Sequence, residues 1–149
     1  MKAGYLLLAL VLLYGCSDSA DKNEFLVFEL RIAETQAKSG LQEMTLYQSG
    51  EKFYVGDSIF LSNKHIRATD IVEWQSRPQI KVELTPEGTK IFFEFTSNHV
   101  GRSAAMLIDS KLISAPRINA PIPSGTLLIV GSFSHEEAVR FARGIATKE

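Results

Sequence analysis

Three kinds of side chain in this sequence are able to carry chemistry: a serine, a set of histidines and a lone cysteine. Ser58 stands in the run Gly56-Asp57-Ser58-Ile59, the histidines are His65, His99 and His135, and Cys16 is the one cysteine. A serine attacks as a nucleophile when a base removes its proton, imidazoles bind metal ions, and a thiol near a membrane is a target for acylation. Each of these chemistries requires particular neighbours.

The neighbours that an enzyme or a metal site requires are missing around Ser58 and the histidines. The run at Ser58 resembles the nucleophile motif of the GDSL esterases, which pair it with a late histidine that has an aspartate three residues before it. His135 has Ser132 at that offset. A small serine hydrolase using Ser58 is therefore the alternative, and a turn leading into a strand is the preferred interpretation. The histidines share no ligand spacing, so we expect no metal, no cofactor and no enzymatic activity.

Cys16 follows a segment with the pattern of a bacterial lipoprotein signal peptide, residues 1–15. Residues 5–14 form an uninterrupted apolar run of ten residues, whereas a membrane-spanning helix needs about 20. Leu13, Gly15 and Cys16 fit a lipobox, although Tyr14 is bulkier than the small residue usual at its position. An ordinary secretory signal and a retained apolar anchor are the alternatives. The pattern predicts cleavage before Cys16 and acylation of its thiol.

The predicted lipid anchor places the protein in the bacterial cell envelope, facing the periplasm. Two or three acyl chains make such an anchor effectively permanent. Residues 16–23 are small and polar and are expected to form a flexible tether, of which seven extended residues reach about 25 Å. Ser17, next to the predicted lipid-carrying cysteine, resembles the residue that sorts lipoproteins to the outer membrane in enteric bacteria. The expected partners are the membrane, through acylated Cys16, and another protein.

Composition limits the remaining classes of partner. The chain has 149 residues, with 16 Lys and Arg against 17 Asp and Glu, so it offers no excess of positive charge for nucleic acid. A single cysteine cannot form an internal disulfide, so the fold depends on packing alone. Residues 24–146 are long enough for one domain with its own core.

Periodicity over residues 24–146 predicts strands, then a helix, then strands, then a second helix. Thr85 and Pro86 mark the start of the first helix, and Ser134 with Glu137 forms a capping box for the second. Asp109-Ser110 predicts a two-residue hairpin turn. The expected strands cover residues 24–33, 44–47, 52–55, 57–61, 66–74, 79–84, 104–108, 111–118 and 126–130, with a turn at residues 76–78. We expect an α+β fold: a mostly antiparallel sheet with two helices packed on one face.

Several segments of the C-terminal half together resemble a known family signature. They are residues 105–116, which contain Asp109-Ser110 and end in Ser-Ala-Pro, residues 121–125 around Pro121-Ile122-Pro123, residues 129–133, and Glu137-Ala138. They resemble the head subdomain in the first periplasmic region of SecD and SecDF, accessory parts of the bacterial protein-export machine. Ser110 and Ser124 stand where that family usually has glycine. Since we expect no proton-conducting membrane domain here, the resemblance implies the fold and a polypeptide-facing surface, without the motor.

These observations favour a non-enzymatic, lipid-anchored module that binds polypeptide or an envelope protein. A link to protein export is part of this hypothesis. A third hypothesis is a purely structural or inhibitory lipoprotein. The stiff apolar loop over residues 114–125 is expected to present surface at little entropic cost on binding. Phe93 falls off the apolar face of its helix, and Trp74 ends a strand. The predicted protein-binding residues are Ile118, Pro121, Ile122, Pro123, Phe93 and Trp74.

Overall fold

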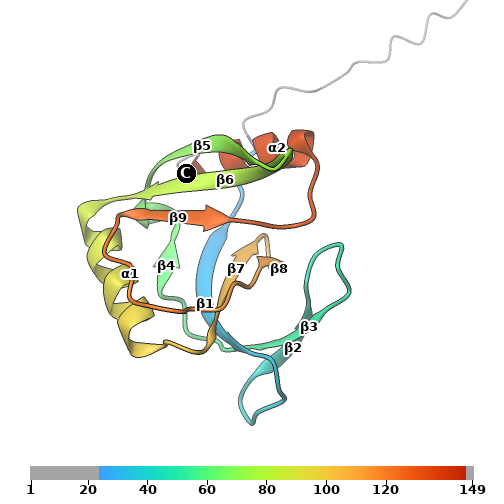
Figure 1. Ribbon diagram of the computed structural model, residues 1–149, viewed down its shortest axis with the longest axis vertical. Helices are drawn as coiled ribbons and strands as arrows, with labels where there is room; N and C mark the ends of the chain where they lie inside the picture. Colours follow the sequence, from blue (N-terminus) through green and yellow to red (C-terminus); the bar gives the residue numbers. More distant parts are fainter. Residues whose placement is uncertain (1–23, 147–149) are drawn as a thin grey trace, which may run out of the picture.

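The computed structural model describes residues 24–146, so the predicted signal peptide, Cys16 and the whole tether lie outside the described residues. Six strands form the larger of two antiparallel sheets, in the order β2-β3-β1-β7-β8 with β4 also paired to β1 (Figure 1). Their bounds are β1 Phe28–Glu34, β2 Gln42–Thr45, β3 Lys52–Val55, β4 Leu61–Ser62, β7 Ser103–Ile108 and β8 Lys111–Ser114.

Three further strands form the smaller sheet, also antiparallel, in the order β5-β6-β9. They are β5 Ile66–Trp74, β6 Arg77–Leu84 and β9 Thr126–Ile129. A short 3₁₀ helix, η1 Asn63–His65, joins the two sheets, and the helices are α1 Pro86–Asn98 and α2 His135–Ala146. In the described part of the chain, no helix is long and apolar enough to span a membrane.

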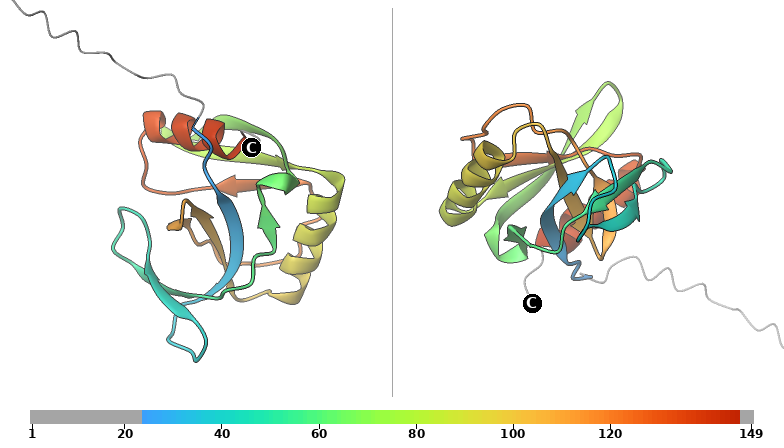
Figure 2. Two further views of the ribbon diagram at one scale, coloured as in Figure 1. Left: turned by 180° about the vertical axis from the view of Figure 1, so that it is seen from behind. Right: turned by 90° about the horizontal axis from the view of Figure 1, so that it is seen from below.

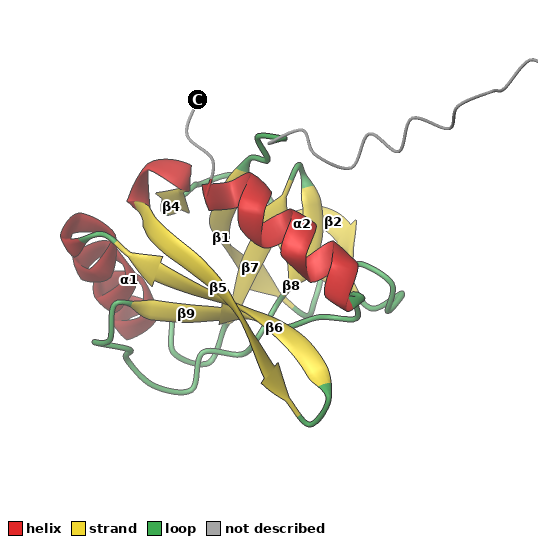
Figure 3. Ribbon diagram, turned by 90° about the horizontal axis from the view of Figure 1, so that it is seen from above, coloured by secondary structure: helices red, strands yellow, loops and turns green. Residues whose placement is uncertain are grey.

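The main core lies between the two sheets, and a second, smaller cluster that includes Phe53 and Leu107 lies on the other face of the larger sheet. Along β1, Phe28, Leu30 and Ile32 are buried in this core, because alternate residues of a strand point to the same face. From the smaller sheet, Ile80 and Ile129 enter the core from neighbouring strands. Helix α2 lies against β5 and β6, and α1 follows β6 at the other end of the sheet (Figures 2 and 3).

Both helices begin with the caps that their sequences predict. The Thr85 hydroxyl accepts a hydrogen bond from the amide of Gly88 at 3.1 Å, and Pro86 occupies the first helical position. In α2, the Glu137 amide donates to Ser134 Oγ at 3.1 Å while the Ser134 amide donates to Glu137 Oε2 at 2.8 Å. The capping box is therefore confirmed.

The α+β class is confirmed, and the structure refines it in one respect. The strands are divided between two sheets that enclose the core, where the sequence suggested a single sheet. The turn of the β5–β6 hairpin is Gln75-Ser76 rather than residues 76–78, and Pro78 lies within β6. Proline is tolerated there because β9 pairs only with the later residues of β6, which leaves the Pro78 end of the strand unbonded on that side.

Candidate functional site

The loop that joins β8 to β9, residues 115–125, runs along one side of helix α1. The Ile122 amide donates a hydrogen bond of 2.9 Å to Thr96 Oγ1 on the helix. Three residues later the loop touches the helix again, because a Cβ at Gly125 would lie 2.5 Å from Thr89 Oγ1. Glycine is required at this second contact, since any side chain would collide with Thr89. Two fixed points thus hold the loop against α1.

Phe93 lies on α1 between these two fixed points. Thr89 stands four residues before it and Thr96 three residues after it, so all three share one side of the helix. The Phe93 side chain is 44% exposed, and Pro121 and Pro123 are also exposed. Ile122 is half-buried and packs against the main core. Phe93, Pro121, Ile122 and Pro123 thus belong to the helix face and the loop that these two contacts join, and we call these four residues the α1–loop surface.

The structure does not place the other two predicted residues on the α1–loop surface. Ile118 belongs to the main core with 4% of its surface exposed, so its side chain is unable to contact a partner in this conformation. Its amide and carbonyl bond to Arg102 and Gly101, which explains why this loop residue is held inside. Trp74 is 65% exposed but lies at the tip of the β5–β6 hairpin, at the opposite end of β6 from α1.

Two exposed apolar residues on the smaller sheet were missed by sequence reasoning. Leu128 is 42% exposed and Val130 is 47% exposed, although both belong to the apolar run at residues 126–130. The run predicts a strand over residues 126–130 but not which of its residues face outward, and β9 buries only Leu127 and Ile129. Its position as the last strand before a capped helix gave no sign that one face is open.

In the described part of the chain, no hydrogen bond joins Ser58 to a histidine, so the structure gives the hydrolase alternative no support. Gly56 and Phe60 pair with β1 through amide hydrogen bonds to Ile32 and Leu30, so the segment between them is a turn. Ser58 is exposed there. Residues 24–146 also contain no group of three potential metal ligands.

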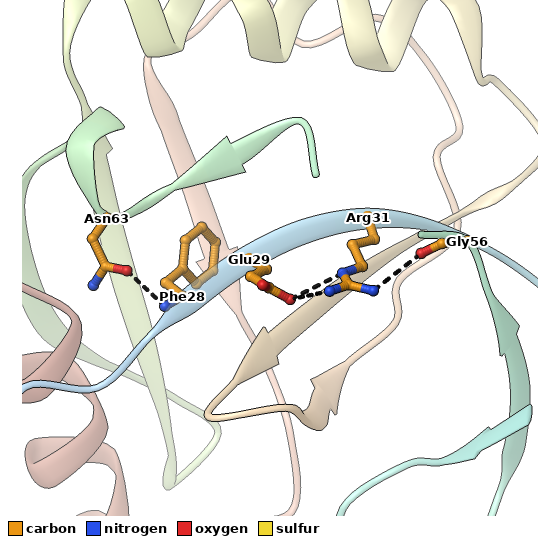
Figure 4. A network of polar contacts seen from close by, with 5 residues as sticks. All are labelled: Phe28, Glu29, Arg31, Gly56 and Asn63. Carbon is orange, nitrogen blue, oxygen red and sulfur yellow. Dashed lines mark hydrogen bonds and ion pairs between the residues drawn. The ribbon is translucent and has the colours of Figure 1, made fainter. Parts of the chain in front are cut away.

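Polar side chains near this segment link β1 to the elements around it (Figure 4). Arg31 binds Glu29 through Nε and a second nitrogen at 2.9 and 2.7 Å, and it also reaches the Gly56 carbonyl at 3.5 Å. At the start of the same strand, the Phe28 amide donates to Asn63 Oδ1 at 2.8 Å. The side-chain nitrogen of Asn63, Nδ2, donates to the carbonyls of Leu26 and Ile145, so η1 connects the start of β1 to the end of α2.

His65 is the one buried histidine of the described residues, and its burial makes stability depend on pH. Burial lowers the pKa of its imidazole below the ordinary 6.5, with a smaller contribution from Lys64, while Glu87 opposes the shift. The unfolded chain therefore takes up a proton that the folded protein resists. The contribution of the neutral His65 imidazole to the free energy of unfolding should be fully present above about pH 6.5. It should fall as the pH drops below that value and level off below the pKa of His65 in the folded protein.

Thermal melting of the wild type and of His65→Asn across this pH range tests the prediction. Asparagine retains an acceptor near the position of Nδ1, which receives the Ser62 amide at 3.0 Å, but it does not titrate. We expect the variant to lose part of the acid-induced fall in melting temperature. Identical profiles for His65→Asn and the wild type would contradict the assignment.

Comparison with known protein families gives a match over most of the chain. The family model for the SecDF P1 head subdomain matches residues 38–146. SecD of Dictyoglomus turgidum is 46% identical over 66 residues, which are 44% of this chain and 16% of that protein. SecD of Rickettsia typhi is 36% identical over 85 residues, or 56% of this chain and 16% of that protein. The chain thus matches about a sixth of the length of these relatives.

Solved structures agree with the sequence matches. A structure described as a membrane component SecDF that enhances protein export has a TM-score of 0.67 at 25% identity, and the match covers 83% of this chain and 63% of that one. SecDF in a super-membrane-facing form also has a TM-score of 0.67, at 26% identity, with 83% of this chain and 19% of that chain covered. The signature segments in residues 105–138 fall within the region that the family model matches.

Proposed function

Because the chain belongs to the SecDF P1 head subdomain family, we propose that it is a non-enzymatic module of the cell envelope that binds polypeptide through the α1–loop surface. One observation supports the proposal: the loop that carries Ile122 contacts α1 at Thr96 and at Thr89, on the side of the helix that also carries Phe93. Exposed apolar side chains on a rigid backbone favour protein binding, because little conformational entropy is lost.

Two further features support an unfolded or extended polypeptide as the ligand class. The α1–loop surface consists of aromatic, aliphatic and proline side chains without a charged member, so it suits apolar segments of varied sequence. The relatives are named protein translocase subunits, so a polypeptide is the ligand class that their names suggest for this chain. A surface that contacts passing chains needs no catalytic group.

The proposal includes a lipid anchor on Cys16, which would hold the domain near the membrane on the periplasmic side. Its basis is the sequence pattern of residues 1–16, which lie outside the described residues. Anchoring by acyl chains would keep the start of the domain, at residue 24, within about 25 Å of the bilayer. The choice of the outer membrane rests on Ser17 alone and is a prediction.

Photocrosslinking in intact cells tests this function. A photoreactive amino acid at Pro123 should form crosslinks to newly exported chains in the envelope fraction, and one at Lys52 on the distant β2–β3 hairpin should not. Adding Ile122→Asp should reduce the crosslinks at residue 123 about tenfold, because a partner would bury an unpaired charge.

Ser124→Asp is the matched control, since it adds the same charge two residues away on an exposed side chain. Melting curves of both variants verify that the domain remains folded. Equal crosslinking of Ile122→Asp and Ser124→Asp would show that the α1–loop surface is not the contact. Crosslinks absent from every position would favour a structural or inhibitory lipoprotein.

A further inference from the structure

Strand β9 has an outer edge whose backbone groups have no partner in the described part of the chain. The Leu84 amide donates to the Gly125 carbonyl at 2.8 Å, and the register pairs Val82 with Leu127 and Ile80 with Ile129. In an antiparallel ladder every second residue bonds to its neighbour strand, so Thr126 and Leu128 direct their amides and carbonyls away from β6. Two donors and two acceptors therefore line the outer edge of β9.

Three other edge strands, β2, β8 and β5, are protected, and β9 differs from them. Edge strand β2 carries Glu43, which binds Lys52 at 2.8 Å. The Leu112 carbonyl of β8 accepts the Tyr47 amide at 2.8 Å, so the β2–β3 turn occupies that edge. Helix α2 lies against β5, where Thr69 Oγ1 donates to the Ala142 carbonyl at 2.9 Å.

Edge strands of soluble proteins usually carry charges, prolines or a covering segment, because an open edge pairs with other chains. β9 has the sequence Thr-Leu-Leu-Ile, with neither a charge nor a proline. On its outward face Leu128 and Val130 are 42% and 47% exposed. Only beyond the strand does a side chain intervene, where the Val130 amide donates to Ser114 Oγ at 3.3 Å. The edge is open in its backbone and apolar in its side chains.

We propose that the outer edge of β9 binds an extended polypeptide segment by strand addition, with apolar side chains of that segment beside Leu128 and Val130. This inference rests on the proposed function, since it names the binding mode for the same class of ligand. An extended backbone is the ligand that matches alternating donors and acceptors at strand spacing. Because main-chain groups supply the bonds, such an edge accepts many sequences.

A second copy of this chain fits the edge less well than a passing segment. A stable dimer buries about 800 Å² on each partner, whereas two four-residue strands such as β9 would pair over a small part of that area. The loop that carries Pro121, Ile122 and Pro123 continues directly into β9 through Gly125. Figure 1 shows this loop returning to β9 from below, so a segment bound at the edge lies next to the α1–loop surface.

The test compares two labelled peptides of about seven residues, in which valine and threonine alternate between terminal lysines. One peptide has ordinary amides, and the other is N-methylated at all internal amides, which removes every strand donor and leaves the side chains in place. Fluorescence anisotropy with the full chain in detergent measures both affinities. We expect the methylated peptide to bind about tenfold more weakly, because it is unable to donate to the carbonyls of Thr126 and Leu128.

A matched pair of protein variants locates the binding to β9. Leu128→Pro removes an outward amide donor without breaking a bond to β6, and Leu128→Ala removes the side chain but keeps that donor. Proline should weaken binding of the unmethylated peptide about tenfold, and alanine by about threefold. Melting curves verify folding, and Thr126→Pro, which removes the other outward donor, provides a second variant should Leu128→Pro fail to fold.

The possible outcomes separate this inference from the function on which it rests. Equal binding of both peptides, with a loss caused by Ile122→Asp, would overturn strand addition and leave polypeptide binding intact. Binding of neither peptide would overturn strand addition, while the crosslinking experiment would still decide the proposed function. Sedimentation that shows self-association, abolished by Leu128→Pro, would assign the edge to a second copy and also overturn the inference.

Discussion

Replacing Phe95 with alanine should lower the free energy of unfolding by about 3–5 kcal/mol. Phe95 is 2% exposed, and its ring lies 4.8 Å from that of Phe60 and 5.0 Å from that of His99. Removing the ring leaves a cavity where α1 meets the segment between β3 and β4, and those neighbours are held by backbone bonds that limit collapse into the space. Urea unfolding followed by circular dichroism measures the change.

Phe93→Ala is the matched control, because it makes the same substitution two residues away on the same helix. Phe93 is 44% exposed and should cost about 1 kcal/mol or less. The two variants also separate stability from binding: Phe93→Ala should reduce crosslinking at the α1–loop surface while the domain stays folded. Equal losses of stability in both variants would show that the buried face of α1 has been assigned wrongly.

The elements predicted most accurately depend on residues close together in the sequence. Thr85 and Pro86 define the start of α1, and Ser134 with Glu137 defines the start of α2, because each cap closes within three residues. The turn at Asp109-Ser110 is also confirmed, with φ angles of 47° and 63° that suit a type I′ hairpin. Hydrogen bonds between residues close together in the sequence can be predicted without knowledge of the remaining chain.

The division of the strands into two sheets depends on pairings between distant segments. β1 pairs with β7 over the register Phe28–Ile108, and β6 pairs with β9 across the whole of α1 and the β7–β8 hairpin. Alternation shows which residues of a strand face a core, but it does not show which strand lies beside it. A single sheet and two facing sheets therefore give the same pattern.

The candidate surface was predicted in part, for the same reason. Pro121 and Pro123 are exposed, and the stiffness that they give the loop is a property of the residue itself, because proline fixes φ. Ile118 is buried because Arg102 and Gly101 bond its backbone, two contacts made across the α1–β7 connection. The exposure of Leu128 likewise follows from the place of β9 at an edge, which is a property of the sheet.

The point where the chain enters the domain depends on one close approach, between Leu26 and Gly144. The Leu26 amide donates to the Gly144 carbonyl at 3.0 Å, and the Leu26 side chain lies over the glycine with 3% of its surface exposed. Glycine inside a helix costs about 1 kcal/mol relative to alanine, so its presence in α2 requires a compensating contact. A Cβ on Gly144 would collide with Cγ of Leu26 and lie 2.9 Å from its Cβ.

Gly144→Val should therefore lower the free energy of unfolding by about 3 kcal/mol, because the valine would displace Leu26 and separate the entering segment from α2. Chemical unfolding of the variant measures this loss. Ala146→Val is the control, since it places the same side chain at an exposed position of the same helix.

A double-mutant cycle identifies the cause of the loss. Gly144→Ala and Leu26→Ala should each destabilise the domain, one by crowding and the other by leaving a cavity. Together they should cost about 1 kcal/mol less than the sum, because the smaller residue at position 26 makes room for the new methyl group. Strict additivity would mean that Leu26 does not press on Gly144. If Cys16 carries an acyl chain, this contact would transmit a pull from the membrane to the domain. Gly144→Val should also raise protease cleavage near residue 26, because it separates the entering segment from α2.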